Sequence, residues 1–255
     1  MLRRMVLAAI AAVAIGSASQ PAQAGIIGDF VLVLDESSSI DSNEFALEKQ
    51  FARDFVNSLP FGQSTFSPGQ LDVLAGLALF GTVARQVRLL DGNEVSLINA
   101  INQANNQGGS TNYSAAINLG ISMLTAPHLA TRTVPKVIIF LSDGVDTGNS
   151  MLTDAAIAAM NAANIITFSI GVGNNIDSAR LIDVANGDPS HFFLANNFGG
   201  LTNVLNPLLM AAMQATTPPP PPPTDVAEPA MLALFSLGLV GLGCAARSRR
   251  TRAAA

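Results

Sequence analysis

The chain has 255 residues, 49% hydrophobic and 12% charged, so its middle can bury a core and is not expected to be disordered. The net charge of the whole chain is −5, but its middle is more acidic, because six of the 13 basic residues lie in the first four or last nine positions. Residues 25–214 carry seven basic and 16 acidic residues, a net charge of −9, so we expect no nucleic-acid partner.

Residues 1–24 are predicted to be a signal peptide. Arg3 and Arg4 give a positive start, residues 5–15 are apolar, and Ala22-Gln23-Ala24 is a small-x-small cleavage motif. The alternative, a buried or membrane helix, fits less well because the apolar run is short and the cleavage motif follows it. We therefore expect the body, residues 25–214, to be exported as one folded domain.

Apolar runs and helical patterns alternate along this body. Runs typical of strands occupy residues 29–34, 73–80, 84–89 at the sheet edge, 136–141, 165–172 and 191–194. Helical spacing is found between Asp41 and Pro60, and at residues 95–102, 114–124, 154–163, 178–185 and 201–213, where Pro207 could introduce a kink. Asp41 is placed to cap the first helix, with Glu44 at the capping-box position.

This alternation predicts an α/β fold. The expected architecture is a Rossmann-like, doubly wound and mostly parallel central sheet with helices on both faces. In such folds ligands bind beyond the carboxyl ends of the strands. Polar residues that follow the apolar runs are therefore the first candidates for a functional site.

The C-terminal part divides into a linker, an apolar segment and a basic tail. Residues 215–226 include six consecutive prolines and predict a stiff polyproline spacer. Residues 230–246 are uncharged and are just long enough for a membrane-spanning helix. Arg247, Arg249, Arg250 and Arg252 follow as a basic stop that would stay on the cytoplasmic side.

Residues 227–255 resemble the PEP-CTERM protein-sorting signal in the order of their parts and their terminal position. The family carries Pro-Glu-Pro before the helix, and this chain has Ala227-Glu228-Pro229. The resemblance implies processing by an exosortase-type sorting enzyme and delivery to the cell surface or extracellular matrix of a Gram-negative bacterium. The alternative is a plain C-terminal membrane anchor, and in both cases the helix meets the membrane before any processing and the body faces outward.

Three polar segments lie where a parallel sheet would place a ligand. One strand ends in Asp35-Glu36-Ser37-Ser38-Ser39, another in Ser142-Asp143-Gly144, and Gly109-Ser110-Thr111-Asn112 opens a helix between them. If the two strands are neighbours, these segments converge. Hydroxyl oxygens of Ser37, Ser39 and Thr111 could then coordinate a hard cation directly, while Asp35 and Asp143 hold coordinated waters and balance the charge.

These five positions resemble the metal-ion-dependent adhesion site (MIDAS) of the von Willebrand factor A (VWA) domain family. The family pattern, Asp-x-Ser-x-Ser followed by a distant Thr and a distant Asp, falls on Asp35, Ser37, Ser39, Thr111 and Asp143. The resemblance covers residues 28–214. It implies a bound Mg²⁺, with Mn²⁺ or Ca²⁺ as alternatives, that accepts a carboxylate from a partner.

Simpler roles are open to these loop residues. Asp and Ser after a strand often only cap the next helix, which is the simpler role for Ser39 and Asp41 and the expected one for Ser38. We interpret Glu36 and Asp146 as solvated loop acids, with tuning of the charge at the site as the alternative. For the five positions together, metal binding is the preferred interpretation.

The sequence predicts a surface or extracellular-matrix binding module, not an enzyme, whose metal binds a carboxylate-bearing protein or an acidic polysaccharide. One alternative is a metal-assisted hydrolase, although such a site usually needs a general base and both histidines, His128 and His191, are expected to be structural. A second alternative is a structural matrix protein with a vestigial site. The sequence does not identify the ligand.

Overall fold

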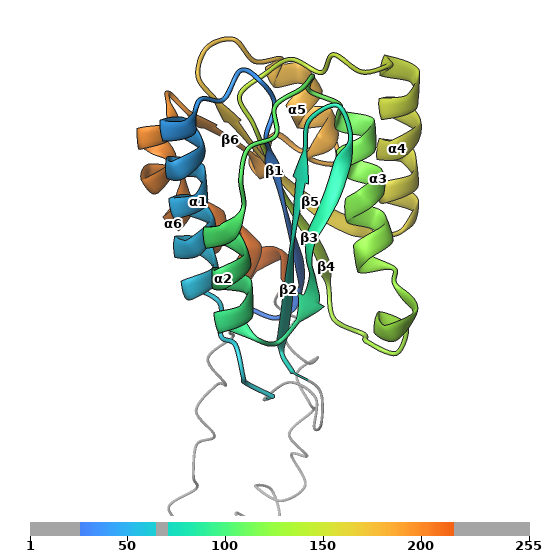
Figure 1. Ribbon diagram of the computed structural model, residues 1–255. Coiled ribbons are helices and arrows are strands. Elements are labelled where there is room, and N and C mark those ends of the chain that lie inside the picture. Colours follow the sequence, from blue (N-terminus) through green and yellow to red (C-terminus); the bar gives the residue numbers. More distant parts are fainter. Residues whose placement is uncertain (1–25, 65–70, 217–255) are drawn as a thin grey trace, which may run out of the picture. The chain divides into compact units, whose positions relative to one another are not determined.

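The computed structural model describes residues 26–64 and 71–216 (Figure 1). The predicted signal peptide, most of the predicted linker and the predicted sorting signal with its helix at residues 230–246 lie outside these ranges. Among the described residues, no helix is both long and apolar enough to cross a membrane.

A six-stranded sheet with the order β3-β2-β1-β4-β5-β6 forms the centre of the domain. Its strands are β1 (Gly28–Asp35), β2 (Val73–Phe80), β3 (Ala84–Asp91), β4 (Lys136–Ser142), β5 (Ile165–Val172) and β6 (Phe192–Ala195). All neighbouring strands are parallel except β3, which runs antiparallel to β2 at one edge. The predicted mostly parallel α/β sheet, with the third strand at its edge, is confirmed.

Helices cover both faces of the sheet (Figure 1). One layer contains α1 (Ser42–Asn57), α2 (Glu94–Gln103) and α6 (Leu201–Thr216), and the other contains α3 (Tyr113–Leu124), α4 (Ser150–Ala162) and α5 (Ser178–Val184). Side chains alternate between these layers along β1, since Leu32 and Leu34 pack with the first and Val31 and Val33 with the second. Burial on both faces accounts for the nearly continuous apolar sequence of this strand.

The start of α1 follows the predicted capping chemistry. The Asp41 carboxylate accepts hydrogen bonds from the amides of Asn43 and Glu44 at 2.7 and 2.9 Å, and the Glu44 carboxylate accepts one from the Asp41 amide at 3.0 Å. This reciprocal capping box satisfies amides that the first helical turn leaves unpaired. It fixes the direction in which the chain leaves the carboxyl end of β1.

Two helices differ in extent from the predicted ranges. Helix α4 begins at Ser150, four residues earlier than predicted, with Asn149 as its N-cap. Met151 and Leu152 in its first turn are exposed, so the helical spacing of core-facing apolar residues begins only after this turn. The sequence pattern therefore placed the start of the helix too late. Helix α6 continues through Pro207, which cannot donate a backbone hydrogen bond, and ends three residues beyond the predicted position.

A buried ion pair joins the amino ends of the central strands. The guanidinium of Arg132, which precedes β4, donates to both carboxylate oxygens of Asp29 at 2.8 and 3.0 Å. It also donates to the carbonyl of Leu71, just before β2, at 2.9 Å. Because Asp29 is fully buried and the Arg132 side chain is only 8% exposed, the pair links three segments in an environment with little solvent screening.

Arg132→Ala is expected to lower the free energy of unfolding by about 3–5 kcal/mol, because it leaves the Asp29 carboxylate buried without its partner. Urea denaturation followed by circular dichroism measures this change. Arg53→Ala, which removes an arginine that hydrogen-bonds only Asn102 and Gln50 on the surface, is the control and should shift the free energy by less than about 1 kcal/mol. Equal effects of the two substitutions would contradict a stabilising role for the buried pair.

Candidate metal site

The two strands that end in the predicted aspartates are neighbours in the sheet. Strands β1 and β4 pair in parallel with Leu34 opposite Leu141, so Asp35 and Asp143 follow at the same edge. The condition on which the predicted convergence depended, adjacency of these two strands, is therefore met. The chain turns into α1 after one strand and toward α4 after the other.

Hydrogen bonds connect four of the five predicted residues. The Asp35 carboxylate accepts from the Ser37 amide at 2.8 Å and from the Ser142 hydroxyl at 2.6 Å. The hydroxyl oxygens of Ser37 and Ser39 lie 2.9 Å apart, and the Ser39 hydroxyl donates to Asp143 Oδ1 at 2.7 Å. Ser39 therefore bonds across to the second strand end and does not act only as a helix cap. The result is a continuous set of oxygen atoms between the two carboxylates.

The fifth residue, Thr111, reaches the same place from the loop before α3. Thr147 fixes its backbone, accepting from the Thr111 amide at 3.0 Å and donating to the Thr111 carbonyl through its own amide and hydroxyl at 2.8 and 3.0 Å. A Cβ atom built on Gly144 would lie 3.2 Å from Thr111 Oγ1 and 3.9 Å from Ser39 Oγ. Glycine at position 144 thus leaves space beside two of the candidate ligand oxygens.

Ser38 has a larger role than the capping role expected for it. Its hydroxyl accepts from the Gly109 amide at 2.8 Å, and its amide donates to the Gly109 carbonyl at 2.9 Å. Gly109 has φ of +108° and lies close enough to Thr82 that a Cβ would approach the Thr82 hydroxyl within 2.5 Å. These contacts tie the loop that carries Thr111 to the loop that carries Ser37 and Ser39.

The prediction that Glu36 and Asp146 are solvated acids is wrong. Glu36 is 3% exposed and accepts two hydrogen bonds from the Arg85 guanidinium at 2.9 and 2.7 Å. Asp146, with a side chain 7% exposed, accepts from the amides of Tyr113 and Gly148 and from the Thr153 hydroxyl. Both acids orient the loops around the site, because their oxygens satisfy backbone and side-chain donors in those loops.

Burial dominates the electrostatics of the two central carboxylates. Loss of hydration raises the pKa of Asp35 to about 6, although hydrogen bonds from Ser142 and Ser37 partly oppose the change and the Asp143 charge adds to it. Loss of hydration also raises the pKa of Asp143, with a further contribution from the charge of Glu44. A nearby cation would lower both pKa values, since it favours the ionised forms.

Glu48 is a residue at this site that the sequence prediction missed. This fully buried carboxyl group on α1 accepts from the Asp35 amide at 3.1 Å through Oε1. Its Oε2 atom is buried without a hydrogen-bond partner among the described residues. Burial, then the charges of Asp35 and Asp143, raise its pKa well above the ordinary value. Phe45 and Ala52, three residues before Glu48 and four after it, lie on the buried face of α1. An acidic residue at this helical spacing is the sequence signal that could have identified Glu48.

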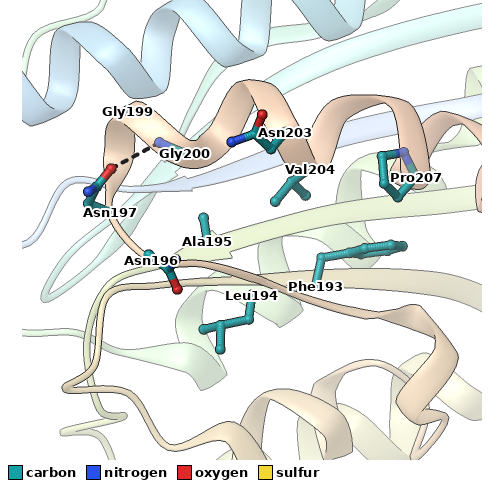
Figure 2. Close-up of a pocket in the computed structure, with 10 residues that line it drawn as sticks. All are labelled: Phe193, Leu194, Ala195, Asn196, Asn197, Gly199, Gly200, Asn203, Val204 and Pro207. Carbon is teal, nitrogen blue, oxygen red and sulfur yellow. Dashed lines mark hydrogen bonds between the residues drawn. The ribbon is translucent and has the colours of Figure 1, made fainter.

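A cavity of about 510 Å³ lies between β6 and α6 (Figure 2). Asn196, Asn197 and Asn203 contribute amides to its wall, together with Phe193 and Pro207. Asn197 already accepts a hydrogen bond from the Gly200 amide at 3.0 Å. Neither a carboxylate nor any of the five predicted ligands is among the described residues that line it, so this cavity is separate from the site at the ends of β1 and β4.

In metal-free solution, the free energy of unfolding is expected to fall as the pH rises from about 4 to about 7. The raised pKa of Asp35 means that the folded state retains a proton that the unfolded chain releases above about pH 4, so folding becomes less favourable until the folded group also ionises. The contribution of Asp35 to this fall should amount to roughly 2–3 kcal/mol, and the fall can be measured by urea denaturation with a chelator present.

Asp35→Asn should make this fall smaller, because the amide does not titrate, and should leave the part that comes from the raised pKa values of Asp143 and Glu48. Asp188→Asn is the matched control: Asp188 is exposed and its pKa is lowered, mainly by its hydrogen bond from Ser190, so the fall seen in the parent should persist in this variant. An unchanged pH profile in Asp35→Asn would contradict the assignment to Asp35.

Glu48→Gln and Glu48→Ala separate the two effects of the buried carboxyl group. Glutamine keeps an oxygen for the Asp35 amide and cannot ionise, so this variant should be at least as stable as the parent at pH 7 without metal. Alanine leaves that amide unpaired and creates a cavity, which should cost about 2–4 kcal/mol. Urea denaturation at pH 7 compares them, and a glutamine variant less stable than the alanine variant would refute the explanation.

Comparisons with known proteins agree with the observed fold. The family model for the von Willebrand factor type A domain matches residues 29–207. Human integrin alpha-X is 28% identical over 71% of this chain, and the aligned part is 15% of that protein. Human collagen alpha-6(VI) is 25% identical over 70% of this chain, and the aligned part is 8% of that protein. A solved structure of proximal thread matrix protein 1 from the mussel byssus, with a zinc-occupied MIDAS motif, is 21% identical with a TM-score of 0.63, covering 74% of this chain and 46% of that one. The chain belongs to the von Willebrand factor type A domain family.

Proposed function

We propose that this domain is an extracellular binding module in which Asp35, Ser37, Ser39, Thr111 and Asp143 hold a divalent cation that accepts a carboxylate from a protein or an acidic polysaccharide. The observation that carries the proposal is the continuous set of hydroxyl and carboxylate oxygens between the ends of β1 and β4. The relatives named as integrin and collagen chains, and the zinc-occupied MIDAS of the mussel protein, support it.

The donor set fits a hard divalent cation. The five side chains supply oxygen atoms, which Mg²⁺ prefers, and Mn²⁺ and Ca²⁺ are alternatives. Asp35 and Asp143 are already close enough to raise the pKa of Asp35, so a cation would relieve their mutual repulsion. When bound, the cation would supply a Lewis-acidic centre for an incoming carboxylate oxygen.

The protein side of this interaction is a preorganised platform. Ser37 and Asp35 are 1% and 0% exposed, whereas Ser39 is exposed, so the oxygen set runs from the interior to the surface. Ser38 and Thr147 hold the three loops in fixed positions relative to one another through hydrogen bonds to Gly109 and Thr111. A partner that approaches from solvent would therefore meet a site whose loops need little rearrangement.

The two histidines do not favour the alternative of a metal-assisted hydrolase. His128 lies in the short helix η1 (Pro127–Leu129), close enough to influence the charge of Asp29 at the opposite end of β1. His191 packs its ring 4.5 Å from that of Phe168. Since neither imidazole belongs to the oxygen cluster, the usual general base of such an enzyme is not supplied by a histidine. We therefore propose a binding role and not a catalytic one.

Delivery to the cell surface or matrix of a Gram-negative bacterium is part of the proposal. Its support is in the sequence: the signal-peptide pattern of residues 1–24, the proline spacer, and the PEP-CTERM-like segment that would bring an exosortase-type enzyme and the membrane into play. An outward-facing domain would meet both proteins and acidic polysaccharides. A structural matrix protein with a vestigial site remains the alternative, and metal binding discriminates between the two.

Mg²⁺ or Mn²⁺ at millimolar concentration is expected to raise the melting temperature of the purified chain by several degrees, because a ligand that binds only the folded state stabilises it. Differential scanning fluorimetry with and without chelator measures the shift. Asp35→Ala and Asp143→Ala should abolish it, and Asp188→Ala, which removes an exposed carboxylate elsewhere, should retain it. The absence of any shift in the parent chain would refute the metal site.

A further inference from the structure

The cavity between β6 and α6 has a group of side-chain amides that the folded domain leaves free to bind a ligand. Asn196, Asn197 and Asn203 line it, and Figure 2 shows them toward one end. The Asn197 Oδ1 atom accepts from the Gly200 amide, which leaves its Nδ2 atom as a donor. The exposed side chains of Asn196 and Asn203 have no hydrogen-bond partner among the described residues. Both can therefore donate to a ligand and accept from it.

Apolar surface lies toward the other end of the cavity. Phe193 is half-buried, with its ring centroid 6.4 Å from that of Phe168, and it lines the cavity together with the exposed Pro207 (Figure 2). The buried Ala195 and Val204 also line it. A volume of about 510 Å³ is in the range of small-molecule sites, which likewise combine apolar surface with a few polar groups.

The segments that carry these groups are held in place by the fold. Strand β6 pairs with β5, and the Ala195 carbonyl at its end accepts from the Gly173 amide at 2.8 Å. The short helix η3 (Phe198–Gly200) joins β6 to α6, and the buried side chains of Phe198 and Leu201 anchor this connection in the core. A ligand would therefore meet a cavity whose walls need little rearrangement.

The charges around the cavity favour a neutral ligand. No charged side chain is among the described residues that line it, and residues 25–214 as a whole carry seven basic and 16 acidic residues. An anion would find no counter-charge in the cavity and would be repelled by the body, whereas a cation would find no carboxylate there. Hydroxyl groups suit the amides, because each hydroxyl both donates and accepts. A peptide backbone fits less well, since its donors and acceptors are spread along a chain and the amides are gathered at one end.

We propose that this cavity binds one unit of a neutral saccharide. Hydroxyl groups on one edge of the sugar ring would exchange hydrogen bonds with the amides of Asn196 and Asn203, and Asn197 Nδ2 would donate to another. The C–H face of the ring would cover Phe193 and Pro207 and remove their apolar surface from water. The site is separate from the proposed metal site and needs no cation, so the domain would bind two ligands of different chemistry.

The test uses the full-length chain with a chelator present. The probe is an array of neutral oligosaccharides of glucose, galactose, mannose and N-acetylglucosamine, with uronic-acid oligosaccharides and uncharged peptides on the same surface. A saccharide that binds is then titrated by calorimetry against the parent, Asn196→Ala/Asn203→Ala, and Asn206→Ala. Asn206 is the matched control, because it is an exposed asparagine on α6 that does not line the cavity.

The expected result is binding of at least one neutral oligosaccharide in the presence of chelator. Its affinity should fall at least about tenfold in the double variant, which loses two hydrogen-bonding side chains, and stay unchanged in Asn206→Ala. Three outcomes would overturn the inference: no neutral saccharide binds, the double variant binds as tightly as the parent, or only the uronic-acid oligosaccharides or the peptides bind. Since the chelator removes cations, each of these outcomes leaves the proposed metal site to its own test, the shift in melting temperature.

Discussion

The placement of two carboxylates, one fully buried and one half-buried, at the ends of adjacent parallel strands is the constraint on which this domain depends. Asp35 is fully buried, which raises its pKa, and the negative charge of Asp143 repels that of Asp35 and raises this pKa further. Folding must keep them together despite this repulsion, and the sheet does so through the pairing of β1 with β4. The local electrostatic cost at this edge is offset by the two apolar layers that bury both faces of the sheet.

Loop-to-loop hydrogen bonds hold the residues at this edge in a defined arrangement of oxygen atoms. Ser38 joins the first loop to the second through Gly109, Thr147 joins the second to the third through Thr111, and Asp146 accepts from donors in the loops and in α4. Ser38, Thr147 and Asp146 do not belong to the expected ligand set. Their role is to restrict the positions of residues that do belong to it, which lowers the entropy lost when a cation or partner binds.

The sequence predicted the sheet well because burial on both faces leaves a strong apolar signal. Strands β2 and β5 have the predicted bounds, and four of the five candidate ligands lie at or just after the ends of two such runs, while Thr111 lies in the loop before α3. The sequence predicted less where a side chain departs from the usual relation between polarity and burial. Glu48 is an acid in the core, Asp146 is a buried loop acid, and Met151 is an apolar residue in solvent. Their environments depend on tertiary contacts that periodicity does not report.

The buried acids among these departures lie at one edge of the domain. Glu48 contacts Asp35, Asp146 lies in the loop after β4, and Met151 is in the first turn of the helix that follows this loop. Apolar residues such as Val95 and Met210 are also exposed elsewhere among the described residues, so the exposure of Met151 does not by itself distinguish this edge. The carboxyl groups of Asp35 and Glu48 do distinguish it, because each is fully buried and hydrogen-bonded only to hydroxyl or amide groups, whereas the buried Asp29 is paired with Arg132. A cation bound at this edge would favour the ionised carboxylates and so offset the cost of burying them.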